Sequence, residues 1–261
     1  MPTLASIVVA ALVGGVLSTV IAGFTLALDP KWIPRLVSFA IGALLGAVFL
    51  EIVPHALEAG DAHGVMVVML AGLLGFFVLE KLVIWRHSHG HDQHVDAREE
   101  SEHDHALHGI DEGRSGLMIL IGNSVHSFCD GIVIAAAFLA GDALGYAATL
   151  AIVAHALPQQ VGDFAVLVNS GYTRRRAFTV NVTTGLATLA GALVAYFALA
   201  GMTQALPIVL ALAGASLLYV AVADLIPSLH RRSEPLQTVG QSLLIAAGVG
   251  VIAAVHALLP H

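Results

Sequence analysis

The sequence predicts an all-α integral membrane protein in which eight transmembrane helices form one bundle. Three observations lead to this fold class. Hydrophobic residues make up 57% of the chain and charged residues only 11%, whereas about 25% of a soluble domain is charged. The mean hydropathy is +0.87. The apolar residues gather in runs close to the roughly 20 residues that cross a bilayer, and they lack the alternating pattern of a transmembrane barrel.

Eight apolar runs leave almost no length for a separate soluble domain, so we expect one domain over residues 1–261. The first run is uncharged and lacks the basic start and short apolar core of a cleaved signal, which favours a retained span. Glycine and alanine are frequent throughout, as close helix packing within lipid requires. The expected spans cover residues 4–28, 34–57, 63–85, 114–139, 143–168, 175–200, 205–229 and 236–259.

Lysine and arginine predict the orientation of these spans. All eleven lie in or beside alternate connections, and the other connections and both termini have none. Because positive residues favour the cytoplasmic side, we expect both termini outside and the third connection in the cytoplasm. The basic residues are Lys31 and Arg35; Lys81, Arg86, Arg98 and Arg114; Arg174, Arg175 and Arg176; and Arg231 and Arg232.

The third connection, about residues 87–113, is rich in histidine and acidic residues. It cannot build an apolar core, so we expect it to be disordered. Its imidazoles and carboxylates suit zinc and similar ions, although their spacing fits no closed tetrahedral site. A metal buffer or sensor and a solvated linker that binds metal incidentally are both open. Its histidines are His87, His89, His91, His94, His103, His105 and His108.

The fourth and fifth spans carry possible metal ligands at their midpoints. His126 and Asp130 are four residues apart, as are His155 and Gln159, so each pair shares one helix face. An ionisable residue in the bilayer core costs on the order of 3 kcal/mol unless it is compensated. The pattern therefore favours a metal site, while hydrogen bonding between helices is the alternative for a single histidine.

The second span adds Glu51, which we place roughly 7 Å above its midpoint, at a height similar to that of Asp130. Two carboxylates would neutralise a divalent cation, and His126 and His155 would favour borderline metals. We therefore expect a site of these four residues with Gln159. A hydrated Glu51 in a proline-kinked half-span is the alternative.

Further polar residues extend this pattern toward both membrane surfaces. Asn123 and Ser127 share the fourth span with the ligands, and Asp163 continues the fifth span toward the cytoplasm. His55 and Glu58 border the outer surface. We expect these five residues to line a pathway for the ion, with structural pairing or simple hydration as the alternative. The single cysteine, Cys129, excludes an intrachain disulfide, and we interpret it as a small buried residue of the fourth span rather than a ligand.

The two central motifs resemble those of the ZIP family (Zrt-, Irt-like proteins) of divalent metal transporters. The family pattern His-Asn-x-x-Asp-Gly stands here as His126-Ser127-Phe128-Cys129-Asp130-Gly131. The pattern His-Glu-x-Pro-His-Glu-x-Gly-Asp-Phe-Ala stands as His155-Ala156-Leu157-Pro158-Gln159-Gln160-Val161-Gly162-Asp163-Phe164-Ala165. With eight spans and a histidine-rich third loop, the likeness covers nearly the whole chain. It implies an inverted repeat around spans four and five.

The departures from the family pattern bear on the metal site. Some members hold a second metal, but the corresponding positions here are Ser127, Ala156 and, by approximate matching, Thr188. Gln159 replaces a stronger His or Glu ligand. The second span also reverses the familiar order of His and Glu, since Glu51 precedes His55. One metal site with altered selectivity is therefore expected.

The resemblance implies a transporter, with no enzymatic activity and no cofactor, that imports a divalent cation by alternating access. We expect Zn²⁺ first, with Fe²⁺, Mn²⁺, Co²⁺ and Cd²⁺ as alternatives that ligand type alone does not rank. No Gly-x-x-x-x-Gly-Lys loop is present, which argues against ATP as the driver. The expected partners are the cation and the lipid bilayer, without nucleic acid; a homodimer is left open.

Three other functions compete with this interpretation. A membrane-embedded zinc hydrolase would use the same ligands but lacks the His-Glu-x-x-His signature. A non-transporting metal sensor would signal through the histidine-rich loop, and an exporter would differ only in direction. Compact, alanine-rich spans favour a multi-pass protein of a bacterial inner (plasma) membrane, with a eukaryotic organelle as the alternative.

Overall fold

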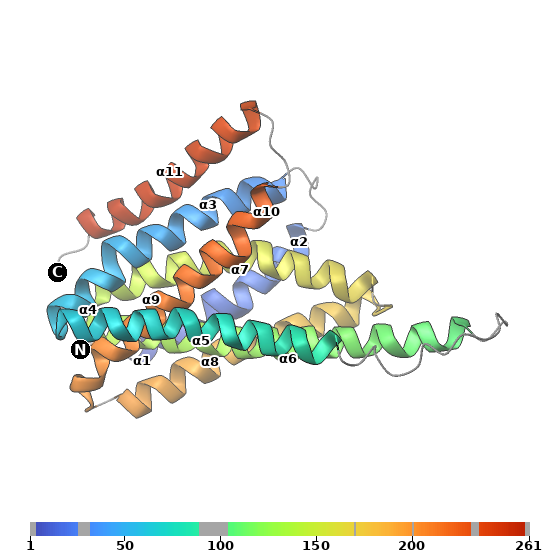
Figure 1. The fold of residues 1–261 in the computed structure, drawn as a ribbon, viewed down its shortest axis with the longest axis horizontal. Helices are drawn as coiled ribbons and strands as arrows, with labels where there is room; N and C mark the ends of the chain where they lie inside the picture. The colour runs from blue at the N-terminus through green and yellow to red at the C-terminus, as the bar shows by residue number, and fades with distance from the viewer. Residues whose placement is uncertain are drawn as a thin grey trace.

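The computed structural model describes residues 4–25, 32–88, 104–169, 171–199, 201–230 and 235–258, which form helices joined by short turns. Within these ranges, eight helical segments are long and apolar enough to cross a membrane. They lie side by side, and the first helix begins at the same end of the bundle at which the last one ends (Figure 1). The prediction of an all-α fold with eight spans is therefore confirmed.

Five spans are continuous α-helices, and three are divided by a short π-helical segment. The divided spans are α1 (Leu4–Leu12), η1 (Val13–Leu17) and α2 (Ser18–Thr25); α3 (Ile33–Gly46), η3 (Ala47–Ile52) and α4 (Val53–Ala59); and α9 (Leu206–Tyr219), η5 (Val220–Leu225) and α10 (Ile226–His230). The continuous spans are α5 (Ala62–Ser88), α6 (Asp104–Ala140), α7 (Asp142–Asn169), α8 (Arg174–Leu199) and α11 (Pro235–Leu258), and the turn η4 (Thr203–Ala205) precedes α9.

The fourth span differs from its expected bounds. The prediction placed its start at residue 114 and disorder over 87–113, but α6 begins at Asp104 and α5 continues to Ser88. Lengthening a helix that already exists adds one hydrogen bond for each residue fixed and requires no new nucleation, so α6 can extend beyond its apolar part. Residues 89–103 of the expected disordered loop lie outside the described residues.

The second and seventh spans share one layout. Each begins with a 14-residue α-helix that has proline at its second position, Pro34 or Pro207. A six-residue π-helical segment follows, and the next helix again has proline second, Pro54 or Pro227. Proline lacks the N–H that would satisfy the preceding turn, so a wider turn before it relieves the conflict. The two spans run in opposite directions (Figure 1), as the inverted repeat implied by the family resemblance requires.

The helix that carries His126 and Asp130, α6, packs against α8 with almost no space between the backbones. A Cβ atom at Gly131 would lie 1.9 Å from the carbonyl oxygen of Thr188, and one at Gly191 would lie 2.0 Å from that of Phe128. Only glycine fits at such a contact between membrane helices. The position of Asp130, next to Gly131, is thus set by the packing of α6 on α8.

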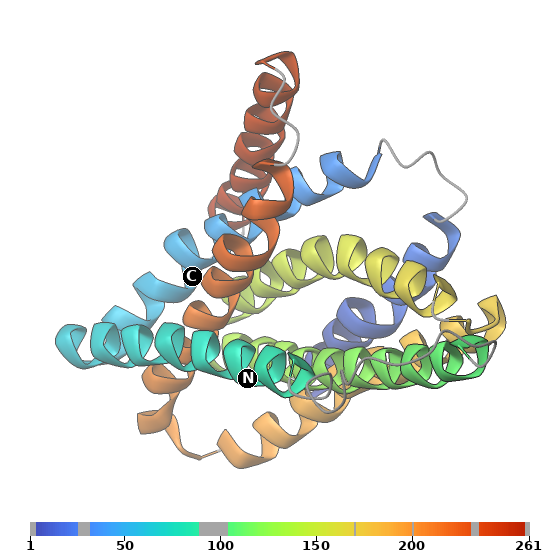
Figure 2. The ribbon, with the colours of Figure 1, turned by 45° about the vertical axis from the view of Figure 1, so that its right-hand side comes forward.

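At the opposite edge of the bundle, α11 lies against α3 (Figure 2). A Cβ atom at Gly42 would lie 2.0 Å from the carbonyl oxygen of Ile245, and one at Gly248 would lie 2.3 Å from that of Phe39. Small residues therefore hold this pair of helices in contact along their length.

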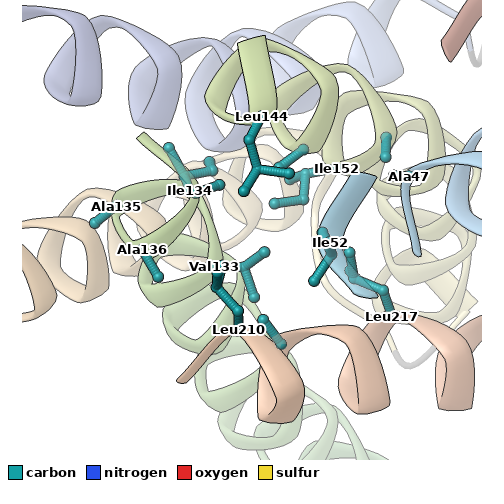
Figure 3. Close-up of a cluster of buried hydrophobic side chains, with 14 of the residues drawn as sticks. Ala47, Ile52, Val133, Ile134, Ala135, Ala136, Leu144, Ile152, Leu210 and Leu217 are labelled. Atoms are coloured by element: carbon teal, nitrogen blue, oxygen red, sulfur yellow. The ribbon is translucent and has the colours of Figure 1, made fainter. Parts of the chain in front are cut away.

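The largest group of buried apolar side chains lies between α6, α7, η3 and α9. Val133 lies one turn after Asp130 on α6, and Ile152 lies one turn before His155 on α7. Because α6 ends and α7 begins at the end of the bundle where α11 ends, the cluster separates the two polar residues from that end. Figure 3 shows its main members, Ala47, Ile52, Val133, Ile134, Ala135, Ala136, Leu144, Ile152, Leu210 and Leu217.

Candidate metal centre

The packed helices bring three of the predicted ligands together. His126 and Asp130 lie one turn apart on α6, and His155 approaches them from the middle of α7. Oδ2 of Asp130 is 3.6 Å from Nε2 of His126 and 3.4 Å from Nε2 of His155, and the two Nε2 atoms are 3.3 Å apart. In the part of the chain that the structure describes, they form the one group of three such side chains close enough to hold a metal ion. We call these three residues the ligand triad.

The spacing of the ligand triad suits a tetrahedral cation. Zinc binds nitrogen and oxygen ligands at about 2.0 to 2.2 Å, which places the corners of a tetrahedron about 3.3 to 3.6 Å apart. The three separations in the triad fall within this range. Three protein ligands also leave one corner of the tetrahedron open for water or for ligand exchange.

The ring orientation of His155 prepares it to bind a cation. Its Nδ1 lies 3.1 Å from the carbonyl oxygen of Ala151, one turn earlier on α7. Because a carbonyl only accepts hydrogen bonds, Nδ1 carries a proton, so in the neutral ring the lone pair is on Nε2. That lone pair faces the other two ligands of the triad, and such a backbone contact is a common way to orient a metal-binding histidine.

Asp130 is a buried anion whose hydrogen bonds are incomplete. The residue is 4% exposed, and its Oδ1 has no hydrogen-bond partner among the described residues. A carboxylate removed from water is unfavourable unless charge or hydrogen bonds compensate it. A cation bound by the triad would supply this compensation at the point where the carboxylate meets two imidazoles.

Four other predicted residues lie on the same two helices. Ser127 is buried beside His126, and Gln159 is half-buried one turn after His155. Asn123 and Asp163 are half-buried farther along α6 and α7, toward the end at which α6 begins. Their helix positions agree with a polar path past the triad, and their part in ion movement stays a prediction.

Glu51 lies outside the ligand triad. It is fully buried on η3, and its Oε1 is 2.9 Å from Nδ1 of His256 near the end of α11. Its height along the span was a reasonable basis for prediction, but a π-helical segment changes the direction in which side chains leave a helix. His256 was not among the residues predicted to have a function; its position near the C-terminal end of the last apolar span was the available signal.

The remaining predicted residues lie away from the triad or outside the description. Nδ1 of His55 lies 2.8 Å from the carbonyl oxygen of Glu51, and Glu58 is exposed on α4. Cys129 is half-buried rather than buried. The side chains of the loop histidines lie outside the described residues; they belong to His87, His89, His91, His94, His103, His105 and His108.

The positions expected for a second metal carry no carboxylate. Ser127, Ala156 and Thr188 are all buried, and the backbone of Thr188 is the surface against which Gly131 packs. Hydroxyl and methyl groups do not neutralise a divalent cation. A single metal at the triad therefore stays the prediction.

Comparison with known proteins places these features in context. A family model described as "ZIP Zinc transporter" matches residues 3–116 and 85–256. The protein named "Zinc transporter ZIP13" from Pongo abelii is 31% identical over 235 residues, which cover 84% of this chain and 65% of that protein.

Two further relatives show similar coverage. "Zinc transporter zipt-7.2" from Caenorhabditis elegans is 31% identical over 261 residues, covering 82% of this chain and 56% of the relative. "Zinc transporter SLC39A7" from Mus musculus is 28% identical over 292 residues, covering 83% of this chain and 61% of the relative. The chain therefore matches a little over half to nearly two thirds of the length of these relatives.

Proposed function

Because this chain belongs to the ZIP zinc transporter family, we propose that it imports Zn²⁺ into the cytoplasm and that the ion crosses the membrane through the ligand triad. The observation that carries the proposal is the spacing of the three ligand atoms, 3.3, 3.4 and 3.6 Å, at the middle of two membrane spans. This spacing fits the tetrahedral geometry that zinc adopts in proteins.

The composition of the triad suits a site that must both bind and release its ion. Two neutral imidazoles and one carboxylate, Asp130, select a borderline divalent cation and neutralise only part of its charge. Glu51 lies outside the triad, so the site lacks a second carboxylate that would hold the ion more tightly. Transport requires a site that binds the ion strongly enough for it to enter and weakly enough for it to leave.

The two histidines of the triad differ in exposure. The side chain of His126 is 21% exposed, whereas that of His155 is 1% exposed. The apolar cluster that contains Val133 and Ile152 covers the side toward the end of α11. A cation arriving from that end can reach the triad only after this cluster separates, and such a change between two accessible sides is alternating access.

The charge pattern supports an orientation of the spans, whereas import is proposed from the family resemblance and needs a measurement of directional flux. The positive-inside rule puts the end of α11 outside the cell and the start of α6 in the cytoplasm. With this orientation the buried cluster would lie on the outer side of the triad, as we expect of a state that faces the cytoplasm. We retain the bacterial inner membrane as the proposed location, with Fe²⁺, Mn²⁺, Co²⁺ and Cd²⁺ as competing substrates.

Family membership weighs against the hydrolase interpretation, since the family and the relatives named above are transporters. The sensor interpretation requires binding without flux. It is separated from transport by measuring ion movement directly.

The direct test is initial zinc uptake into proteoliposomes that contain purified protein and an internal fluorescent indicator. Asp130→Ala and His155→Ala each remove one ligand, and we expect each to lower saturable uptake at least about tenfold because ligand losses weaken metal sites strongly. Val125→Ala is the matched control, since Val125 directly precedes His126 on α6 but is 60% exposed.

The proposal is supported if Val125→Ala takes up zinc like the wild-type protein and the two triad variants do not. Equal uptake in all four proteins would move the pathway away from the triad. Binding without flux in the wild-type protein would instead support the sensor.

A further inference from the structure

Glu51 is a second buried carboxylate that the triad does not use. It is 0% exposed on η3, next to the fully buried Ile52. Neither of its carboxylate oxygens has a hydrogen-bond partner in the described part of the chain. A carboxylate in such surroundings is stable only when a positive charge lies beside it, so the position points to a ligand.

The neighbouring group is an imidazole rather than a lysine or arginine. Nδ1 of His256 lies 2.9 Å from Oε1 of Glu51, yet the contact lacks the direction of a hydrogen bond. In the neutral ring with its proton on Nε2, Nδ1 of His256 and Oε1 of Glu51 would both offer lone pairs, an arrangement that a shared cation stabilises. The contact is therefore better explained as a pair of metal ligands than as a completed hydrogen bond.

Burial changes sharply between the two side chains. The side chain of His256 is 45% exposed and lies near the last residue of α11, whereas that of Glu51 is 0% exposed. Together they lead from the end of the helix pair α3 and α11 into the protein. Their end of the bundle is the one separated from the ligand triad by the apolar cluster.

We propose that Glu51 and His256 form a second binding site for a divalent cation at the outer end of the α3–α11 pair. We infer cation binding there from the two side chains alone. Its role as an entry site that precedes the ligand triad rests on the proposed function. A cation bound there waits on the outer side of the apolar cluster until the triad becomes accessible.

The spacing of this pair predicts a hydrated ion. Ligands at right angles around a cation with bonds of about 2.0 to 2.1 Å are about 2.9 Å apart, the arrangement of octahedral coordination. The Glu51–His256 separation matches this value, while the triad separations of 3.3 to 3.6 Å match tetrahedral coordination. The outer site would thus hold a cation that keeps several waters, which it loses on reaching the triad.

His55 adds a second imidazole on the outer side of Glu51. Its Nδ1 lies 2.8 Å from the carbonyl oxygen of Glu51, so Nδ1 donates and Nε2 keeps a lone pair. This ring is oriented in the same way as His155 in the triad.

A purely structural role for the pair is the competing explanation, because His256 could hold α11 against α3. These helices are already in contact through Gly42 and Gly248, and the fully buried Ile252 packs over Gly46. A half-exposed imidazole at the helix end adds little to that packing, so the cation site is favoured.

The test places one thiolate in the outer site and reads cadmium binding from its ultraviolet thiolate absorption band. The full-length protein first receives Cys129→Ser, which leaves no cysteine, and then His256→Cys. The loop histidines do not contribute to this band. We expect the band to saturate at a cadmium concentration roughly tenfold lower than in the control Ala257→Cys, and Glu51→Gln to abolish the difference. Ala257 is exposed on the same helix end.

Zinc uptake by His256→Gln in the otherwise native chain provides the second readout. We expect the half-saturating zinc concentration to rise roughly tenfold while the maximal rate changes little, because an entry site is filled at high concentration. Equal cadmium titrations at residues 256 and 257, or a lower melting temperature of His256→Gln with unchanged half-saturation, would overturn the outer site. Absence of uptake in the wild-type protein would overturn the proposed function while leaving the cadmium result to decide the outer site.

Discussion

At the scale of single residues, the sequence could predict the triad because its members follow helix geometry. His126 and Asp130 share a face by their four-residue spacing, and His155 sits at the midpoint of the next span. Glu51 could not be assigned in the same way, because its direction depends on η3 and its neighbour His256 comes from the other end of the chain. The spacing of two residues on one helix can be read from the sequence, whereas a contact between spans that are distant in the sequence cannot.

Gln159 offers a prediction at this scale, because it lies one turn after His155 where a stronger ligand would fit. We expect Gln159→His to lower the half-saturating zinc concentration about tenfold, since imidazole binds zinc better than an amide does. The maximal uptake rate should fall, because a tighter site releases its ion more slowly. Gln160→His, on the next position of the helix, is the control. An unchanged concentration dependence for Gln159→His would remove this position from the metal's surroundings.

At the scale of elements, hydrophobic runs predicted all eight spans, whereas the π-helical segments were not predicted. The thickness of the bilayer sets the length of each hydrophobic run, so the runs can be recognised in the sequence. A π-helical turn depends on which carbonyl oxygen accepts a hydrogen bond from each N–H, and hydropathy does not predict this pattern. The matching prolines of the second and seventh spans, Pro54 and Pro227, were the signal that could have located η3 and η5.

The contact of α6 with α8 gives a prediction about an element as a whole. Gly131→Ala would place a methyl group 1.9 Å from the Thr188 carbonyl oxygen, so the helices must separate. We expect a loss of roughly 1 to 3 kcal/mol in stability, as for other overpacked interiors, and a large loss of uptake as Asp130 moves. Thermal unfolding in detergent and zinc uptake measure the two effects.

Gly122→Ala is the matched control for this substitution. Gly122 lies on the same helix, and nothing lies within 4 Å of an added Cβ atom. If both alanine variants unfold at the same temperature and transport equally, close packing of α6 does not position the triad.

At the scale of the whole molecule, the apolar cluster lies between the triad and one end of the bundle. Exposure of His126 and burial of Val133 and Ile152 predict that a water-soluble reagent reaches the site from one side only. In a Cys129→Ser background, a cysteine at Asn123 should react with such a reagent from the cytoplasmic side, and one at Ile134 should react from neither side. Equal reaction at Ile134 from outside would contradict a closed outer route.

The histidine-rich segment over residues 87–108 should be separable from the transport step of the whole molecule. Replacing its seven histidines with glutamine removes their metal affinity, but leaves the triad and the packing of the spans unchanged. We expect the initial rate of zinc uptake at saturating zinc to stay the same. A rate that falls with the triad intact would place these histidines on the transport pathway.

The most direct test of the central claim is the position of zinc in crystals of the protein, found from anomalous scattering at the zinc edge. The account predicts a peak about 2.0 to 2.2 Å from Nε2 of His126, Oδ2 of Asp130 and Nε2 of His155, which disappears in Asp130→Ala crystals. Strong zinc peaks elsewhere within the spans, with none between these three atoms, would contradict it.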